Sequence, residues 1–210
     1  MRSVNVNMGK GRLEAFSDGV IAIIITIMVL ELRVPDKPTL EALKSVWPVF
    51  INYIVSFIYI GIYWNNHHHM FQAVRSINGA ALWANMHLLF WMSTVPFVTS
   101  WLGKFTFAED KWPMALYGFV LLMNAIAYTI LAQKLIRHEG KNSALATALG
   151  KNWKGTISLV FYCVAIGFAF ISTSAFMSTY ISFGLYVLVA CMWFIPDQRI
   201  ERKLADEQEK

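Results

Sequence analysis

Long apolar runs, separated by short polar or charged stretches, dominate the pattern of this 210-residue chain. A helix that crosses the hydrocarbon core of a bilayer needs roughly 20 mostly apolar residues, and the runs recur at about that length. We therefore expect an all-α integral membrane protein with six transmembrane helices. The pattern places these helices at 13–32, 46–70, 79–102, 112–136, 156–176 and 178–196.

Glycine and proline residues lie at or near the breaks between these segments. The division between the last two helices is the weakest, because residues 171–182 are rich in serine and threonine but hold no charge. The turn there must be tight. We expect one membrane domain over residues 1–198, followed by a charged cytoplasmic tail at 199–210. No cleavable signal peptide is visible, because residues 1–10 are polar and Asp18 interrupts the first apolar run.

The distribution of basic residues predicts the orientation of the helices. Six spans put both termini on one side, which holds 13 of the 18 Lys and Arg residues, against 5 on the other side. The positive-inside rule therefore predicts cytoplasmic N- and C-termini and a multi-pass protein of the cell membrane. The net charge of +5 does not indicate nucleic-acid binding, because the basic residues lie at the ends of apolar segments. Cys163 and Cys191 fall inside apolar segments, where we expect reduced thiols that pack as small apolar groups.

Polar side chains collect at one depth of the predicted bundle. An unpaired carboxylate in lipid costs several kcal/mol, by estimates from roughly 2.5 to above 10, so Asp18 must face protein or water. Lipid offers these groups no partners, and we expect them to bond one another as a clasp between the first three helices. Whether the clasp also sets the tilt of the first helix or senses pH through histidine is left open. The layer holds Arg12, Ser17, Asp18, Trp64, Asn65, Asn66, His67, His68, His69, Asn78, Asn85 and His87.

Three consecutive histidines, His67 to His69, suggest a metal site, but helical geometry argues against one. Successive side chains diverge by about 100°, so one helix cannot direct all three at a single ion. The spacing H-x-x-x-H of helical zinc sites is absent. A site that recruits His87 and Asp18 from other helices is a minor alternative, and we expect neither a resident metal nor a cofactor.

Further along the first helix, Ile23, Ile27 and Leu30 follow one another at i, i+4 and i+7 and form a branched apolar stripe. Ala22 and Thr26 lie beside the stripe, where small and hydroxylated side chains suit close helix approach. Periodicity alone does not distinguish a lipid-facing stripe from a pore-facing one.

Several familiar motifs are missing from the chain. It has no T-V-G-Y-G filter, no helix with arginine at every third position, and no G-x-S-x-G or H-E-x-x-H motif of enzymes. We therefore predict that the protein is not an enzyme. The residues alone support only a six-span protein with a buried polar layer.

Two segments carry a resemblance to a known family. Arg12-x-x-x-Phe16-Ser17-Asp18, at the start of a first membrane helix, resembles the signature of the transmembrane protein 175 family of potassium channels. The end of the second helix, Tyr63-Trp64-Asn65-Asn66-His67-His68-His69, is similar to the pattern in the prokaryotic members. The six-helix plan with cytoplasmic termini also fits this family.

The resemblance implies a homotetramer of six-helix subunits around a central pore, which the first helix of each subunit lines. It implies that potassium ions and the lipid bilayer are the partners. The narrowest point would be Ile23, five residues after the motif aspartate, followed by rings of Ile27 and Leu30. Ala22 and Thr26 match the neighbouring positions that help to choose between cations.

The function that the resemblance implies is passive permeation by a potassium-permeable cation channel, in which a ring of four isoleucines excludes water and gates by dewetting. The main alternative is a proton-coupled transporter that uses Asp18 and the histidines as a relay. A membrane enzyme or metal-binding protein built on the histidine layer comes after both. We expect one network to hold the first helix at a fixed angle, made of Arg12, Phe16, Ser17, Asp18, Trp64, His67 and His68.

Overall fold

The computed structural model describes residues 9–105, 111–140, 142–149, 153–171 and 175–194, and every regular element within these ranges is an α-helix. The expected all-α class is confirmed, whereas the predicted tail at 199–210 lies outside the described residues. The helices are α1 (Lys10–Leu30), α2 (Leu40–Gln72), α3 (Gly79–Ser93), α4 (Val95–Phe105), α5 (Trp112–Glu139), α6 (Ala144–Leu149), α7 (Trp153–Ile171) and α8 (Ala175–Phe194).

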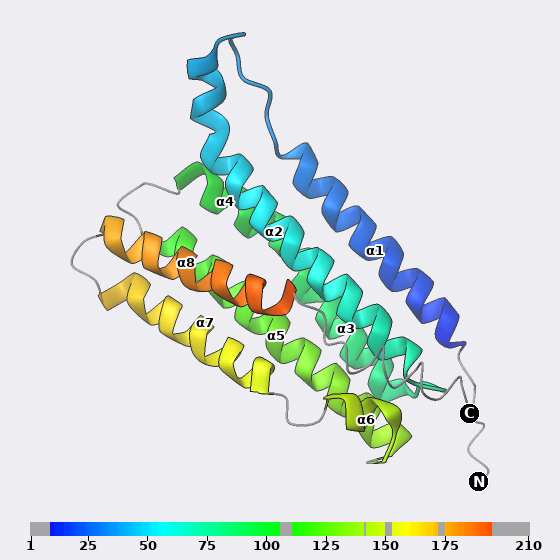
Figure 1. Cartoon of the computed structure of the whole chain (residues 1–210). Coiled ribbons are helices and arrows are strands. Elements are labelled where there is room, and N and C mark those ends of the chain that lie inside the picture. The colour runs from blue at the N-terminus through cyan, green and yellow to red at the C-terminus, as the bar shows by residue number, and fades with distance from the viewer. Residues whose placement is uncertain (1–8, 106–110, 141, 150–152, 172–174, 195–210) are drawn as a thin grey trace.

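Five of the described helices are long and apolar enough to cross a membrane, namely α1, α2, α5, α7 and α8. They correspond to five of the six predicted spans and support a multi-pass membrane protein. The remaining predicted span, 79–102, is covered by α3 and α4, which follow each other along the bundle (Figure 1).

The prediction of one unbroken helix over 79–102 is wrong, because the chain divides at Thr94. Pro96 has no backbone N–H, and its ring would clash with the carbonyl of Met92 in a continuous helix. Thr94 instead ends α3, and its N–H and its hydroxyl both bond the carbonyl of Trp91, at 3.2 and 2.7 Å.

Other helix limits also differ from the prediction. Helix α2 begins at Leu40 rather than 46, because the hydroxyl of Thr39 caps it by accepting from the N–H of Ala42 at 3.3 Å. Helix α8 begins at Ala175, so the predicted boundary between the last two spans, at 176 to 178, is too late. The short helix α6 was not predicted.

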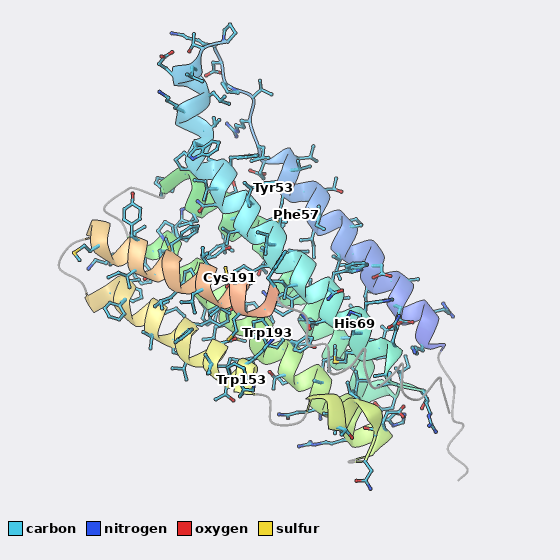
Figure 2. The ribbon with its side chains drawn as sticks, in the orientation of Figure 1. Tyr53, Phe57, His69, Trp153, Cys191 and Trp193 are labelled. Atoms are coloured by element: carbon cyan, nitrogen blue, oxygen red, sulfur yellow. The ribbon has the colours of Figure 1, made fainter. Side chains whose placement is uncertain are left out.

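Helix α5 lies at the centre of the bundle, and α1 lies at one edge (Figure 1). Helix α5 packs against α3, α4, α7 and α8, whereas α1 packs against α2, α3 and α4. Helices α7 and α8 form an antiparallel pair, so Trp153 and Trp193 lie at the same end of that pair (Figure 2). Cys163 and Cys191 are free cysteines, but both are exposed on the subunit, on α7 and α8, and are not packed as expected.

A buried network of hydroxyl groups joins five helices around α5. Lipid would leave these hydroxyls without partners, and each of them instead bonds another helix or its own backbone. The network fixes the mutual register of α2, α4, α5, α7 and α8. Its bonds join Ser56 to Tyr117 at 2.9 Å, Thr99 to Ser56 at 2.7 Å, Tyr162 to Tyr59 at 3.3 Å, Tyr59 to the carbonyl of Tyr186, and Tyr186 to the carbonyl of Met114 at 3.3 Å.

We predict that Gly118→Ala destabilises the protein. A Cβ atom at Gly118 would overlap the hydroxyl of Tyr186 and lie 3.0 Å from a side-chain carbon of Ile166. Overpacking of this kind costs about 1–3 kcal/mol, so the melting temperature in detergent should fall by several degrees. Gly167→Ala on α7 is the matched control, because nothing lies within 4 Å of its Cβ position. Equal melting temperatures of the two variants would contradict the prediction.

Candidate functional site

A directional chain of three hydrogen bonds ties α1 to α2 and α3. The hydroxyl of Ser17 donates to the carbonyl of Leu13 at 2.8 Å and accepts from Nδ2 of Asn85 at 2.9 Å. Oδ1 of Asn85 then lies 2.8 Å from Nε2 of His67. Because Oδ1 can only accept, His67 must carry its proton on Nε2. Every donor therefore points toward α1, from His67 through Asn85 to Ser17.

Burial makes these bonds obligatory. Ser17 and Asn85 have no exposed surface and His67 is 2% exposed, so none of the three reaches solvent within the subunit. An unmet polar group in such a position costs about 1–3 kcal/mol. The arrangement thus fixes both the position and the rotation of the first two turns of α1.

A second contact joins the same helices at the protein surface. Nε1 of Trp64 donates to Oδ1 of Asp18 at 3.0 Å. The ring of Trp64 stacks on His68, with 6.0 Å between ring centroids and 14° between planes. Nε2 of His68 lies 2.8 Å from Nε2 of Gln72, where the amide must donate, so His68 carries its proton on Nδ1. This contact brings the motif carboxylate against the indole of α2.

The three consecutive histidines diverge, as helical geometry predicts. His67 meets Asn85 of α3, whereas His68 meets Trp64 and Gln72 on α2. His69 lies near the end of α2 (Figure 2), with its ring 5.9 Å from that of His68. Among the described residues, no three His, Cys, Asp or Glu side chains are grouped so that they could hold a metal ion.

Two residues of the expected network lie apart from the others. Phe16 is 50% exposed and Arg12 is also exposed. The described part of the chain gives the Arg12 side chain no hydrogen bond within its own subunit. The structure therefore brings together Ser17, Asp18, Trp64, His67 and His68, with Asn85 between them.

Polar contacts also hold the two ends of α1. At its start, Nζ of Lys10 donates to the carbonyl of Val74 at 3.0 Å. Just beyond its end, the hydroxyl of Ser100 on α4 donates to Oε2 of Glu31 at 2.8 Å. Among the described residues, no side chain at 19–30 hydrogen-bonds another helix. The middle of α1 is therefore held by apolar packing alone.

Helix α1 has one packed face and one open face. The open face carries the residues singled out from the sequence, with Ile23 60% exposed, Ile27 45% and Leu30 76%. Ala22 and Thr26 are also exposed. The packed face consists of Leu13, Ser17, Ile21, Ile24 and Met28.

Thr26 presents an oxygen on the open face. It follows Ser17 by about two and a half helical turns and so lies on the opposite side of the helix. Its hydroxyl hydrogen is given to the carbonyl of Ala22, at 2.8 Å. The lone pairs of the oxygen therefore stay available to water or to a cation.

Sequence reasoning placed Asn85 in the polar layer but not in the network that it connects. The sequence did contain a signal for this role of Asn85. An amide inside the mostly apolar segment 81–89 needs both a hydrogen-bond donor and an acceptor as partners. Only neighbouring helices supply both.

A protein-family model matches the part of the chain that contains α1, α2 and α3. The family model of TMEM175, described as an endosomal/lysosomal potassium channel, matches residues 12–96. A potassium channel of Chryseobacterium sp. (strain P1-3) is 54% identical over 199 residues, which cover 95% of this chain and 100% of that protein. The chain belongs to the TMEM175 family of potassium channels. Its relatives are named as channels and not as enzymes.

Further relatives of this TMEM175 chain support both family and fold. A potassium channel of Streptomyces collinus is 33% identical and aligns over 84% of this chain and 90% of its own. The crystal structure of a lysosomal potassium-selective channel TMEM175 homolog from Chamaesiphon minutus matches with a TM-score of 0.72 and 31% identity, over 88% of this chain and 97% of that one. The human endosomal/lysosomal proton channel TMEM175 is 36% identical over 85 residues, only 17% of its length.

We predict that Asn85→Leu lowers the melting temperature of this TMEM175 chain by several degrees, because it leaves His67 and Ser17 buried without their partner. Asn65→Leu is the matched control, since the described residues give Asn65 no hydrogen bond. The triple variant Ser17→Ala, Asn85→Leu, His67→Phe should recover part of the loss, because it removes all the unmet groups. A triple variant less stable than Asn85→Leu alone would contradict this account.

Proposed function

We propose that this chain is a potassium-permeable cation channel of the cell membrane, in which four copies surround a pore lined by α1. The observation that supports it is the open face of α1, which combines branched apolar residues with the outward oxygen of Thr26. A helix at the edge of its subunit, anchored on one side only, is suited to face a shared axis. In this proposal α3 and α4 together make the sixth crossing, and both termini are cytoplasmic.

The proposed constriction is a ring of Ile23 side chains, with Ile27 and Leu30 forming wider apolar rings beyond it. A ring of branched apolar groups excludes water and can close a pore by dewetting. Potassium loses its hydration shell at less cost in free energy than sodium does, so an apolar constriction favours potassium. This preference is weaker than the one that a cage of backbone carbonyls imposes.

Thr26 is the residue to which we assign the finer choice between cations. Its oxygen lone pairs face outward because its proton is given to Ala22. Four such oxygens around an axis would replace part of the water lost at the apolar rings. Ala22 leaves room beside them but contributes no oxygen of its own.

The hydrogen bonds that hold α1 in place indicate how the constriction at Ile23 would open. Hydrogen bonds to other parts of the subunit hold α1 near both ends, at Lys10, Ser17 and Asp18, and just beyond it at Glu31. Residues 19–30 of α1 are held only by apolar contacts, which resist a rotation or tilt of the helix less than hydrogen bonds do. In this mechanism the polar clasp sets the resting angle, and rotation or tilt of the middle of α1 moves Ile23 outward.

We predict that Ile23→Asn raises single-channel conductance several-fold and lowers the preference for potassium over sodium, because a polar ring keeps the constriction wet. Recordings in planar bilayers measure both quantities. Ile23→Val is the control that keeps a branched apolar ring and should change little. If Ile27→Asn changed conductance and selectivity most and Ile23→Asn changed neither, the constriction would lie one helical turn further along α1, at Ile27.

Liposome flux tests the proposed activity directly. Purified protein should dissipate imposed potassium and caesium gradients faster than sodium gradients, with a reversal potential set by potassium. Absence of flux from protein that is shown to be folded and assembled would reject the proposal.

A second candidate, a proton-coupled transporter, has two observations in its favour. Asp18 is an exposed carboxylate on α1, and the human relative, which matches 35% of this chain, is named as a proton channel. Potassium movement driven by a proton gradient at zero current, abolished by Asp18→Asn, would support the transporter. Potassium flux indifferent to the proton gradient favours the channel.

A further inference from the structure

A groove lies where α1, the start of α2 and α4 meet, at the end of the bundle away from Lys10. It consists of two adjoining pockets with volumes of about 410 and 540 Å³. Both pockets are lined by Glu31, Ser100 and Lys104. Volumes of this size are in the range of small-molecule and lipid sites. The groove shares no residue with the Ser17–Asn85–His67 chain.

Two cations of this groove have no hydrogen-bond or ion-pair partner among the described residues. Arg33 and Lys104 both line it and are exposed. Within the described ranges, neither side chain makes a hydrogen bond or an ion pair. Guanidinium and ammonium groups bind phosphate through charge-assisted hydrogen bonds, so the pair suits a phosphate group that lies between α1 and α4.

The same groove also holds one carboxylate. Oε2 of Glu31 accepts from the hydroxyl of Ser100 at 2.8 Å, which fixes the side chain and leaves its other oxygen without a bond in the described residues. A ligand here must therefore satisfy two positive groups and one negative group. A zwitterion that combines a phosphate with a primary ammonium meets this requirement, because the ammonium carries N–H donors for the carboxylate.

A row of aromatic side chains, called the aromatic track here, runs along α2 away from the charged groups of Glu31, Arg33 and Lys104. Rings of Trp47, Phe50, Tyr53 and Phe57 follow one another at centroid distances of 5.8, 6.3 and 6.1 Å. Figure 2 shows Tyr53 and Phe57 along α2, one turn apart. Phe50 and Phe57 are 39% and 43% exposed, so the track presents apolar surface over several turns. An acyl chain fits such a track.

Tryptophan fixes the level of the groove in the membrane. Trp47 lines one pocket and Trp101 lines the other, and tryptophan is enriched at the boundary between lipid headgroups and acyl chains. Charged groups at that level with an aromatic track on one side match the order of a phospholipid, headgroup first and tails behind.

We propose that this groove binds a glycerophospholipid whose headgroup carries a phosphate and a primary ammonium, as phosphatidylethanolamine does. Arg33 and Lys104 hold the phosphate, Glu31 holds the ammonium, and the track along α2 receives an acyl chain. Phosphatidylglycerol lacks the ammonium, and phosphatidylcholine lacks its N–H donors. All residues that line the groove belong to one subunit, and one of them, Ile27, is also part of the apolar rings of the proposed pore.

Native mass spectrometry of the purified assembly tests this site, with phosphatidylethanolamine, phosphatidylglycerol and phosphatidylcholine of identical chains titrated in turn. Wild-type protein should retain phosphatidylethanolamine best. The double variant Arg33→Gln, Lys104→Gln should bind it about tenfold more weakly, a change worth about 1.4 kcal/mol. Glu31→Gln should reverse the order, so that phosphatidylglycerol binds better than phosphatidylethanolamine. Lys37→Gln is the control, because Lys37 is an exposed basic residue outside the groove.

Three results would overturn the proposal. The first is equal retention of phosphatidylethanolamine by wild type and the double variant. The second is an unchanged lipid order in Glu31→Gln, and the third is an assembly structure in which side chains of a second copy fill the groove. Melting temperatures of the variants without added lipid separate loss of the site from loss of the fold, since a folded variant should melt close to wild type.

Discussion

The hydrogen-bond chain from His67 through Asn85 to Ser17 is the constraint on which the arrangement of α1 depends. In lipid there is little hydrophobic force to drive helices together, so polar contacts and close packing decide how they meet. Each group in the chain is buried, and each of its donors has one acceptor. A rotation of α1 by a single residue would break the chain, and the identity of the open face follows from that fixed rotation.

The fold was predictable to the extent that lipid and backbone physics determine it. Apolar runs of about 20 residues located the helices, because a helix satisfies all of its own backbone hydrogen bonds within the membrane. The break at Thr94 was not predicted, although Pro96 is visible in the sequence, because proline is often tolerated in membrane helices. The early start of α2 depends on the cap by Thr39, a local signal that hydropathy does not register.

The depth of each site residue in the membrane was predictable from its own helix. Which residues of different helices contact one another was less predictable. Topology placed Ser17, Asp18 and His67 at one depth, and the structure joins them into two contacts. Depth alone did not show that Asn85 lies between the others, because the partner of an amide depends on helix rotation. The same limit hid the tyrosine network around α5, since a tyrosine in an apolar run looks like packing until its hydroxyl finds a partner.

The length of α2 links the two ends of the molecule. Its 33 residues make a rod about 50 Å long, longer than the hydrocarbon core of roughly 30 Å. One end of this rod carries His67 and Trp64, and the other end borders the groove beside Glu31. One continuous helix therefore joins the polar clasp to the groove. Pro48 lies inside this helix and cannot donate a backbone hydrogen bond, so α2 bends most readily there.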